Sequence, residues 1–151
     1  MTIREIKPGD AAAAAKLSGE LGYPVSAEAM EYRIRARQHL RDHIVLVTCL
    51  ADEIVAWVDV AIVHHLAVDP YGEIGGFVVG EGHRSMGISR TLLAHAEQWI
   101  ASRGISNVVV RSQIKRKGAH RFYLREGYSR TKTSAVFSKT LTLTQPAPAG
   151  H

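Results

Sequence analysis

The sequence predicts an α/β or α+β fold in which one layer of sheet carries helices on its faces. Runs rich in β-branched residues alternate with helical patterns, and three such runs follow one another without a helix between them. A length of 151 residues, 46% apolar and 22% charged, suits one globular domain with one core. We therefore expect a single domain over residues 1–144, followed by a flexible Pro- and Ala-rich tail at 145–151.

The beginning of the chain predicts a strand and then two helices. Residues 2–6 (TIREI) alternate apolar and polar side chains, as a half-exposed strand does. After a Pro-Gly break, Asp10 is expected to cap a helix that runs to about Leu21. Ser26 is expected to cap a second helix through about Gln38.

Three successive strands predict an antiparallel meander. Residues 43–50 (HIVLVTCL) and 54–66 (IVAWVDVAIVHHL) are rich in β-branched side chains and are separated by a short polar turn. Residues 73–79 (EIGGFVV) supply the third strand. Because no helix connects these strands, we expect neighbours in the sequence to pair antiparallel.

The second half predicts two more helices and the remaining strands. Residues 88–103 place apolar side chains every four positions, and Gly104 ends this helix. Residues 107–113 (NVVVRSQ) are typical of a short buried strand, and a helix is expected over residues 116–126. Residues 133–141 (TSAVFSKTL) predict a closing strand.

Charge is unevenly distributed along the chain. The net charge is +5, but residues 1–75 hold 7 Lys and Arg against 11 Asp and Glu, whereas residues 76–151 hold 12 against 3. A polyanion bound by the second half and an amine facing the first would fit this asymmetry, and so would scattered surface charge. We find no helix-turn-helix and no aromatic platform for single strands, so we expect no nucleic-acid partner.

Other patterns exclude further classes of protein. No apolar run is long enough to span a membrane, and the start of the chain has no apolar signal-peptide core. The single Cys49 rules out an internal disulfide framework and is expected to be a buried, inert thiol. No Cys and His spacing indicates a metal site. We expect a cytoplasmic protein without membrane or metal.

The stretch from Val78 to Leu93 (VVGEGHRSMGISRTLL) leads from a strand into a helix through a glycine-rich turn. The first N–H groups of such a helix point at one spot, with the positive end of the helix dipole behind them, and this arrangement binds phosphate. Gly87 allows a positive φ and a close approach of a ligand, and Arg84 adds a fixed charge. An ordinary glycine-rich connection would have the same composition.

Two familiar phosphate-binding loops fit this turn poorly. A Walker A loop ends in Gly-Lys followed by Ser or Thr, and the turn has no lysine. The dinucleotide fingerprint is half matched by Gly80 and Gly82, but Ser85 replaces its third glycine. The next strand also ends without a carboxylate, so we expect no nicotinamide cofactor.

Residues 84–89 (RSMGIS), after a strand that ends in Val78 and Val79, resemble the acyl-CoA loop Q/R-x-x-G-x-G/A of the GNAT N-acetyltransferase superfamily, with Ser89 in place of Gly or Ala. Residues 111–128 (RSQIKRKGAHRFYLREGY) resemble the second signature, a helix that carries A-x-x-F-Y and ends in G-Y. With the order of elements, the resemblance covers nearly the whole chain. It implies an acetyltransferase domain with a mixed central sheet, acetyl-CoA as co-substrate and direct acetyl transfer to an amine.

The resemblance implies two residues that move protons. Tyr123 matches the tyrosine that protonates the CoA sulfur in this family, and the ordinary pKa values of a phenol and a thiol are close enough for the transfer. Glu73 matches the general-base glutamate of the histone acetyltransferase branch, whereas many relatives use ordered water. The alternatives are a core aromatic for Tyr123 and an exposed strand-edge carboxylate for Glu73.

The resemblance also implies the two binding surfaces. The pantetheine arm is expected to pair with the strand at Val78 and Val79, and the basic run around Arg116 to lie near the nucleotide, although many relatives have Asn there. The expected acetyl-CoA contacts are Phe77, Val78, Val79, Arg84, Ser85, Met86, Gly87, Ile88, Ser89 and Arg116. The expected walls of the acceptor site are Tyr23, Tyr32, Trp57, Asp59 and His64.

The acceptor is expected to be a small-molecule or peptide amine. Small amines, amino acids and peptide amines rank above aminoglycosides, because the acidic residues near the expected site are few. A non-catalytic acyl-CoA sensor with the same loop is the alternative function, and a nucleic-acid-binding module is a more distant one. The sequence leaves open whether the chain forms a homodimer.

Overall fold

The computed structural model describes residues 1–84, 87–111 and 117–144. The chain divides into two units, Met1–Arg111 and Ser112–His151, and each is described by itself. The tail at 145–151, expected to be flexible, lies outside the described residues. The single domain over residues 1–144 stays a prediction.

The first unit is built on one mixed sheet with the strand order β1-β2-β3-β4-β5. Neighbours from β1 to β4 are antiparallel, and β5 runs parallel to β4. This confirms the predicted meander. The strands are β1 (Thr2–Glu5), β2 (His43–Leu50), β3 (Glu53–Val63), β4 (Tyr71–Val79) and β5 (Val108–Val110).

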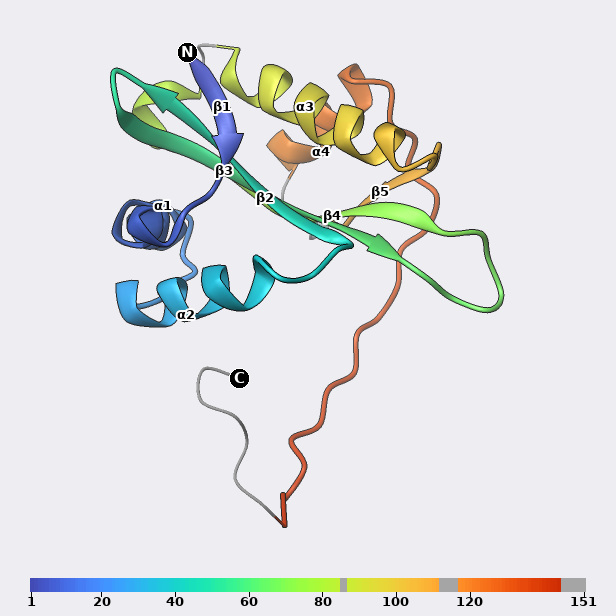
Figure 1. The fold of residues 1–151 in the computed structure, drawn as a ribbon. Coiled ribbons are helices and arrows are strands. Elements are labelled where there is room, and N and C mark those ends of the chain that lie inside the picture. Colours follow the sequence, from blue (N-terminus) through green and yellow to red (C-terminus); the bar gives the residue numbers. More distant parts are fainter. Residues whose placement is uncertain (85–86, 112–116, 145–151) are drawn as a thin grey trace. The chain divides into compact units, whose positions relative to one another are not determined.

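Helices cover both faces of this sheet, α1 and α2 one face and α3 the other (Figure 1). The first unit holds α1 (Ala11–Glu20), α2 (Ala27–Arg37), α3 (Ile88–Ser102) and the short 3-10 turns η1 (Pro8–Asp10) and η2 (Glu81–His83). The second unit holds α4 (Lys117–Arg125). The predicted α/β class is therefore correct.

The pleat of the strands decides which side chains meet which helices. Trp57 on β3 belongs to the α1/α2 side, because its Nε1 donates to the carbonyl of Ala14 in α1 at 3.3 Å. Val58 and Val60, which alternate with it, are fully buried on the opposite side. On that α3 side, a Cβ at Gly72 of β4 would overlap the side chain of Ile100. Glycine is therefore needed there for α3 to approach the sheet.

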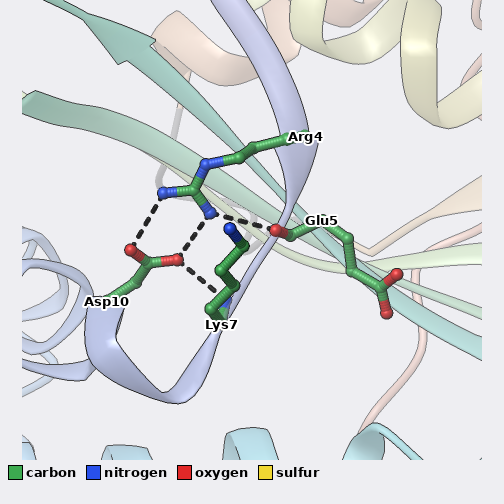
Figure 2. A network of polar contacts seen from close by, with 4 residues as sticks. All are labelled: Arg4, Glu5, Lys7 and Asp10. Carbon is green, nitrogen blue, oxygen red and sulfur yellow. Dashed lines mark hydrogen bonds and ion pairs between the residues drawn. The ribbon is translucent and has the colours of Figure 1, made fainter. Parts of the chain in front are cut away.

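The start of α1 is fixed by a polar network around Asp10 (Figure 2). Arg4 donates from Nη1 and Nη2 to the two carboxylate oxygens of Asp10 at 2.8 and 3.0 Å, and the backbone N–H of Lys7 donates to Oδ2 at 2.7 Å. The bond from Arg4 is the main reason that the pKa of Asp10 is lowered. Asp10 occupies the N-cap position of α1, but its side chain makes no cap hydrogen bond because both oxygens are engaged.

The cap of α2 is confirmed, since Ser26 Oγ accepts from the N–H of Ala29 at 3.0 Å.

Two expectations from the sequence are wrong. Residues 133–141 form no strand and are exposed, with Phe137 at 93%. An alternating pattern is compatible with a strand, but a segment becomes a strand only when it forms hydrogen bonds with a neighbouring strand. Cys49 is half-buried rather than buried, at the edge of the apolar cluster under α1.

Candidate active site

The turn between β4 and α3 has the expected backbone. Gly87 is the N-cap of α3 and adopts the left-handed conformation with φ +72°. Apart from the chain neighbours of Gly87 and its own helix, no described residue has an atom within 4 Å of the place where a Cβ would stand on Gly87. Ile88, fully buried, anchors the first turn, and Ser89 is half-buried. The first N–H groups of α3 have no acceptor within the helix.

Arg84 is tied back to the end of β4. Its Nε donates to the carbonyl of Val79 at 3.3 Å, which keeps the guanidinium beside the turn. Ser85 and Met86, also expected in the acyl-CoA loop, lie outside the described residues. The described part of the loop therefore holds one guanidinium near the start of α3.

The second half of β4 is open along one edge. β5 pairs with β4 only at Gly72, Glu73 and Ile74, whereas Gly76 to Val79 pair on the other side with β3. Between Ile74 and Gly76 the register shifts, so that Gly75 is an extra residue in β4. Such a bulge bends a strand and ends pairing. Among the described residues, no strand covers this edge of β4 where Phe77, Val78 and Val79 lie.

Glu73 lies where the pairing with β5 is still intact. Its Oε1 accepts from Nε of Arg111 at 2.6 Å, and Arg111 also donates to the hydroxyl of Tyr71 at 3.5 Å. The bond to Glu73 is the main cause of the raised pKa of Arg111. The Glu73 side chain is 26% exposed, so the carboxylate reaches solvent. It is neither a free strand-edge charge nor a buried one.

Trp57 and Asp59 lie together on the α1/α2 side of β3. Gly76 stands opposite Asp59 in the register, and a Cβ on Gly76 would come within 2.8 Å of the Trp57 ring. Burial raises the pKa of the Asp59 carboxyl, against the opposing influence of Arg37 and His43. Arg37, at the end of α2, has its Nε 3.7 Å from Asp59 Oδ2. The structure thus brings two of the five expected acceptor walls together.

The other three expected walls lie elsewhere on the first unit. Tyr23 follows α1 and Tyr32 lies on α2, with 50% and 41% of their surface exposed. His64, just beyond β3, contacts Asp42 at 3.3 Å, and Asp42 also contacts Arg103 after α3 at 3.5 Å. His64 is therefore part of a surface ion-pair cluster and is not grouped with Trp57 and Asp59.

Tyr123 lies on α4 in the second unit. Its ring centroid is 5.3 Å from that of Phe122 and 5.8 Å from that of Tyr128, and the second pair meets edge to face. Gly127, with φ +91°, allows the turn that follows α4. Arg116 lies outside the described residues. The roles of Tyr123 and Arg116 stay predictions.

Three residues beside Asp59 and Glu73 were not predicted from the sequence, namely Arg37, His43 and Arg111. Arg37 ends a helix and His43 begins a strand, and neither stands in a motif. Only the pairing register could have found His43, because it stands opposite Ala61, next to Asp59 on the same face. Arg111 falls at the start of the second signature segment, and its link to Glu73 depends on the parallel pairing of β5 with β4.

A family model described as the acetyltransferase (GNAT) family matches residues 12–128. The chain belongs to the GNAT family. This match spans most of the chain and confirms the resemblance that rested on the two signature segments. The open edge of β4 and the Gly87 turn are thus features of a GNAT protein.

Sequence similarity to a curated enzyme is confined to part of this GNAT chain. A segment of 60 residues is 43% identical to the aminoalkylphosphonate N-acetyltransferase of Salmonella typhimurium. It covers 40% of this chain and 39% of that enzyme. The chain therefore matches less than half the length of this relative.

Solved structures resemble the GNAT chain over almost its whole length. The aminoglycoside antibiotic 6'-N-acetyltransferase of Acinetobacter haemolyticus has a TM-score of 0.80 at 17% identity, covering 94% of this chain and 100% of that one. An aminoglycoside N-acetyltransferase in complex with CoA gives 0.81 at 14%, covering 93% and 95%. A transcriptional regulator from Bacillus halodurans gives 0.82 at 20%, covering 91% and 99%. At these identities the likeness establishes the fold.

The described residues contain neither a metal-binding cluster nor a membrane-spanning helix. No group of three or more His, Cys, Asp or Glu side chains among them is arranged to hold a metal ion. No helix in the same part of the chain is both long and apolar enough to cross a bilayer. The cytoplasmic location stays a prediction.

Proposed function

We propose that this GNAT protein is an N-acetyltransferase that moves an acetyl group from acetyl-CoA directly to a primary amine. The observation that carries the proposal is the edge of β4 beyond Ile74, where no described strand pairs with it and from which the chain leads to the Gly87 turn. Acceptors under this proposal are small molecules, amino acids or peptides. The amines of the relatives, aminoalkylphosphonates and aminoglycosides, are candidate acceptors of the same kind.

The described residues fit acetyl-CoA at two points. Beyond Ile74 no described strand pairs with this edge of β4, and an extended arm with amide groups can bind there as an added strand does. The left-handed Gly87 at the start of α3, with Arg84 near the turn, suits the pyrophosphate. A helix end contributes only about 0.3–2 kcal/mol and micromolar binding needs about 8 kcal/mol, so both points are required.

The reaction forms a bond between the amine nitrogen and the acetyl carbon and breaks the bond from that carbon to sulfur. The amine must lose a proton, and the departing thiolate must gain one. Glu73 is our candidate for the first transfer, directly or through water, because among the described residues its Oε2 accepts no hydrogen bond. An N–H of the open β4 edge would polarise the acetyl carbonyl. Tyr123 is our candidate for the second transfer.

Calorimetric titration with acetyl-CoA followed by a thiol-release assay over a panel of amines tests the proposal. We expect saturable binding and release that depends on an amine. Binding without release on any amine would favour a non-catalytic acyl-CoA sensor, a role for which the fold shared with a transcriptional regulator leaves room. Absence of binding would refute both functions.

The tyrosine role has its own test. Tyr123→Phe is expected to lower kcat by about 10²- to 10⁴-fold, the usual contribution of a proton-transfer group, and to keep acetyl-CoA affinity. Tyr128→Phe, a neighbour in the same aromatic contact, serves as the matched control. Equal kcat values for wild type and Tyr123→Phe would assign the proton to another donor.

A further inference from the structure

Three titratable side chains surround one small residue on the α1/α2 side of the sheet. Ala61 of β3 has His43 of β2 opposite it on one side and Glu73 of β4 opposite it on the other. Asp59 is the next residue on the same face of β3, diagonal to both His43 and Glu73. The methyl group of Ala61 therefore lies at the bottom of a polar patch formed by His43, Asp59 and Glu73.

Two guanidinium groups flank this polar patch. Arg111 pairs with Glu73 at 2.6 Å through a hydrogen bond, so its charge is engaged. Arg37 differs, because its Nε is buried yet donates no hydrogen bond, and its distance of 3.7 Å to Asp59 exceeds hydrogen-bond length. About a third of the Arg37 side chain stays exposed, 36%. Arg37 is thus a cation with donors still to be satisfied.

Asp59 and His43 also have unused bonding capacity. Among the described residues, the carboxylate of Asp59 accepts no hydrogen bond, and the buried Nδ1 of His43 has no partner. Buried polar groups are normally hydrogen-bonded, and groups left without partners call for a ligand or water. Ala61 beside them carries only a methyl group, whereas the Trp57 ring covers Gly76.

The unused groups are of opposite charge, and this selects the kind of ligand. An ammonium group would meet the oxygens of Asp59, and an acid group would meet the free donors of Arg37. A plain amine would leave Arg37 unsatisfied, and a polycation would bring a second positive charge close to Arg37 and Arg111. A small zwitterion satisfies both sides at once.

We propose that the acceptor is a small amino acid or aminophosphonic acid, with its amine at Asp59 and its acid group bound by Arg37. This rests on the proposed acetyltransferase function and adds the class of its acceptor. The acid group positions the amine over Ala61, between Asp59 and Glu73, and thus beside the open edge of β4. Arg37 acts on specificity and takes no part in the chemical step.

The first test compares amines that share one carbon spacer. The panel holds 2-aminoethylphosphonate, β-alanine, ethanolamine and ethylenediamine, so that only the group opposite the amine changes. We expect kcat/KM for at least one of the two zwitterions to exceed that of ethanolamine by about 10- to 100-fold, the value of a charge-assisted hydrogen bond. Equal or faster transfer to ethanolamine or ethylenediamine would overturn the proposal. The first two compounds decide between phosphonate and carboxylate.

The second test removes the guanidinium of Arg37. In Arg37→Gln the ratio of kcat/KM for the zwitterion to that for ethanolamine is expected to fall by about 10- to 100-fold, and Arg37→Lys should recover part of it. Arg35→Gln on the same helix is the matched control, because Arg35 is exposed and its ion pair is with Glu31, at 3.7 Å. A ratio unchanged in Arg37→Gln, or lowered equally in Arg35→Gln, would refute the role of Arg37.

A binding measurement separates this proposal from the proposed function. Calorimetric titration with 2-aminoethylphosphonate and with β-alanine, in the presence of saturating CoA, needs no turnover. Zwitterion binding that is at least about 10-fold weaker in Arg37→Gln than in the wild type supports the zwitterion site. If such binding is found but no amine causes thiol release, the site stands and only the acetyltransferase function is refuted. Thiol release on ethanolamine without zwitterion binding keeps that function and overturns the site. Unfolding curves of the variants exclude loss of structure as the cause.

Discussion

The two faces of the same sheet are built differently. Toward α3, β3 and β4 present Val58, Val60 and Ile74, each at most 1% exposed, and α3 itself carries the fully buried Leu92 and Ile100. Toward α1 and α2, the alternate positions of the same strands carry Trp57, Asp59 and Glu73, all half-buried. Because side chains alternate along a strand, one run of residues can supply stability on one side and chemistry on the other. Substitutions on the two faces should therefore have separate effects.

The largest expected effect is on catalysis, from the α1/α2 face. Glu73→Gln should lower kcat by about 10²- to 10⁴-fold if Glu73 accepts the amine proton, and should alter the pH profile of kcat. Because its ion pair with Arg111 is largely exposed, unfolding free energy should change by less than about 1 kcal/mol. Steady-state kinetics and chemical denaturation measure the two quantities, with Glu53→Gln as control. Wild-type kcat and pH profile in Glu73→Gln would point to a water chain as the base.

The next effect is on stability, from the α3 face. Leu92 is fully buried, so Leu92→Ala should lower the unfolding free energy by about 2–5 kcal/mol through lost burial and a cavity. The kcat of the folded fraction should stay near that of wild type. Leu124→Ala, at a leucine that is 58% exposed, should change stability by less than about 0.5 kcal/mol. If Leu92→Ala kept wild-type stability but had a low kcat, the α3 face would contribute to catalysis rather than to stability, contrary to our expectation.

A smaller effect concerns the support of α1. The carboxylate of Asp10 has a lowered pKa because Arg4 binds it. This interaction stabilises the folded protein fully above the ordinary pKa of an aspartate, and the stabilisation is lost as the pH falls through the lowered pKa of Asp10. Asp10→Asn should cost about 1–3 kcal/mol at neutral pH and less in acid. Denaturation at about pH 7 and pH 3 tests this, with Glu20→Gln as control. A cost that is the same at both pH values would show that the charge of Asp10 is not what Arg4 recognises.

The smallest expected effect has the opposite sign. Burial raises the pKa of Asp59 in the folded protein. The folded state is therefore destabilised as the pH rises from the ordinary pKa of an aspartate to the raised pKa of Asp59. Above the raised pKa the full destabilisation is present. Asp59→Asn should therefore stabilise the protein at neutral pH, by less than about 1 kcal/mol, and leave it unchanged in acid. Thermal unfolding at both pH values measures the difference. Destabilisation at neutral pH would show that the contact with Arg37 outweighs burial.

The parts predicted from the sequence were those with local causes. Ser26 caps α2 and Gly87 starts α3 in the left-handed conformation because each needs only its own neighbours in the chain. The meander also followed from local patterns. Residues 133–141 have the same alternation as a true strand, yet whether they pair depends on a partner that no local pattern specifies.

The polar patch shows a second limit of sequence reasoning. Trp57 and Asp59 were expected in the acceptor site from their place in the meander, but Arg37 and His43 join Asp59 only through tertiary packing and strand register. His64 is only 3 residues from Ala61 but lies in the cluster with Asp42, whereas Arg37 is 22 residues from Asp59 and lies beside it. Nearness along the chain does not identify such a site.

The close packing of Gly72 against α3 links position 72 to the first turn of that helix. The contact with Ile100 lies near the C-terminal end of this helix, whereas Gly87 begins it at the other end, about 20 Å away at 1.5 Å per residue. A side chain added at Gly72 would force Ile100 to shift, and a displacement of the α3 backbone at Ile100 would extend to its first turn. Directed evolution toward new amines should leave position 72 alone, since a change there would disturb the helix end that we assign to the diphosphate without touching either substrate.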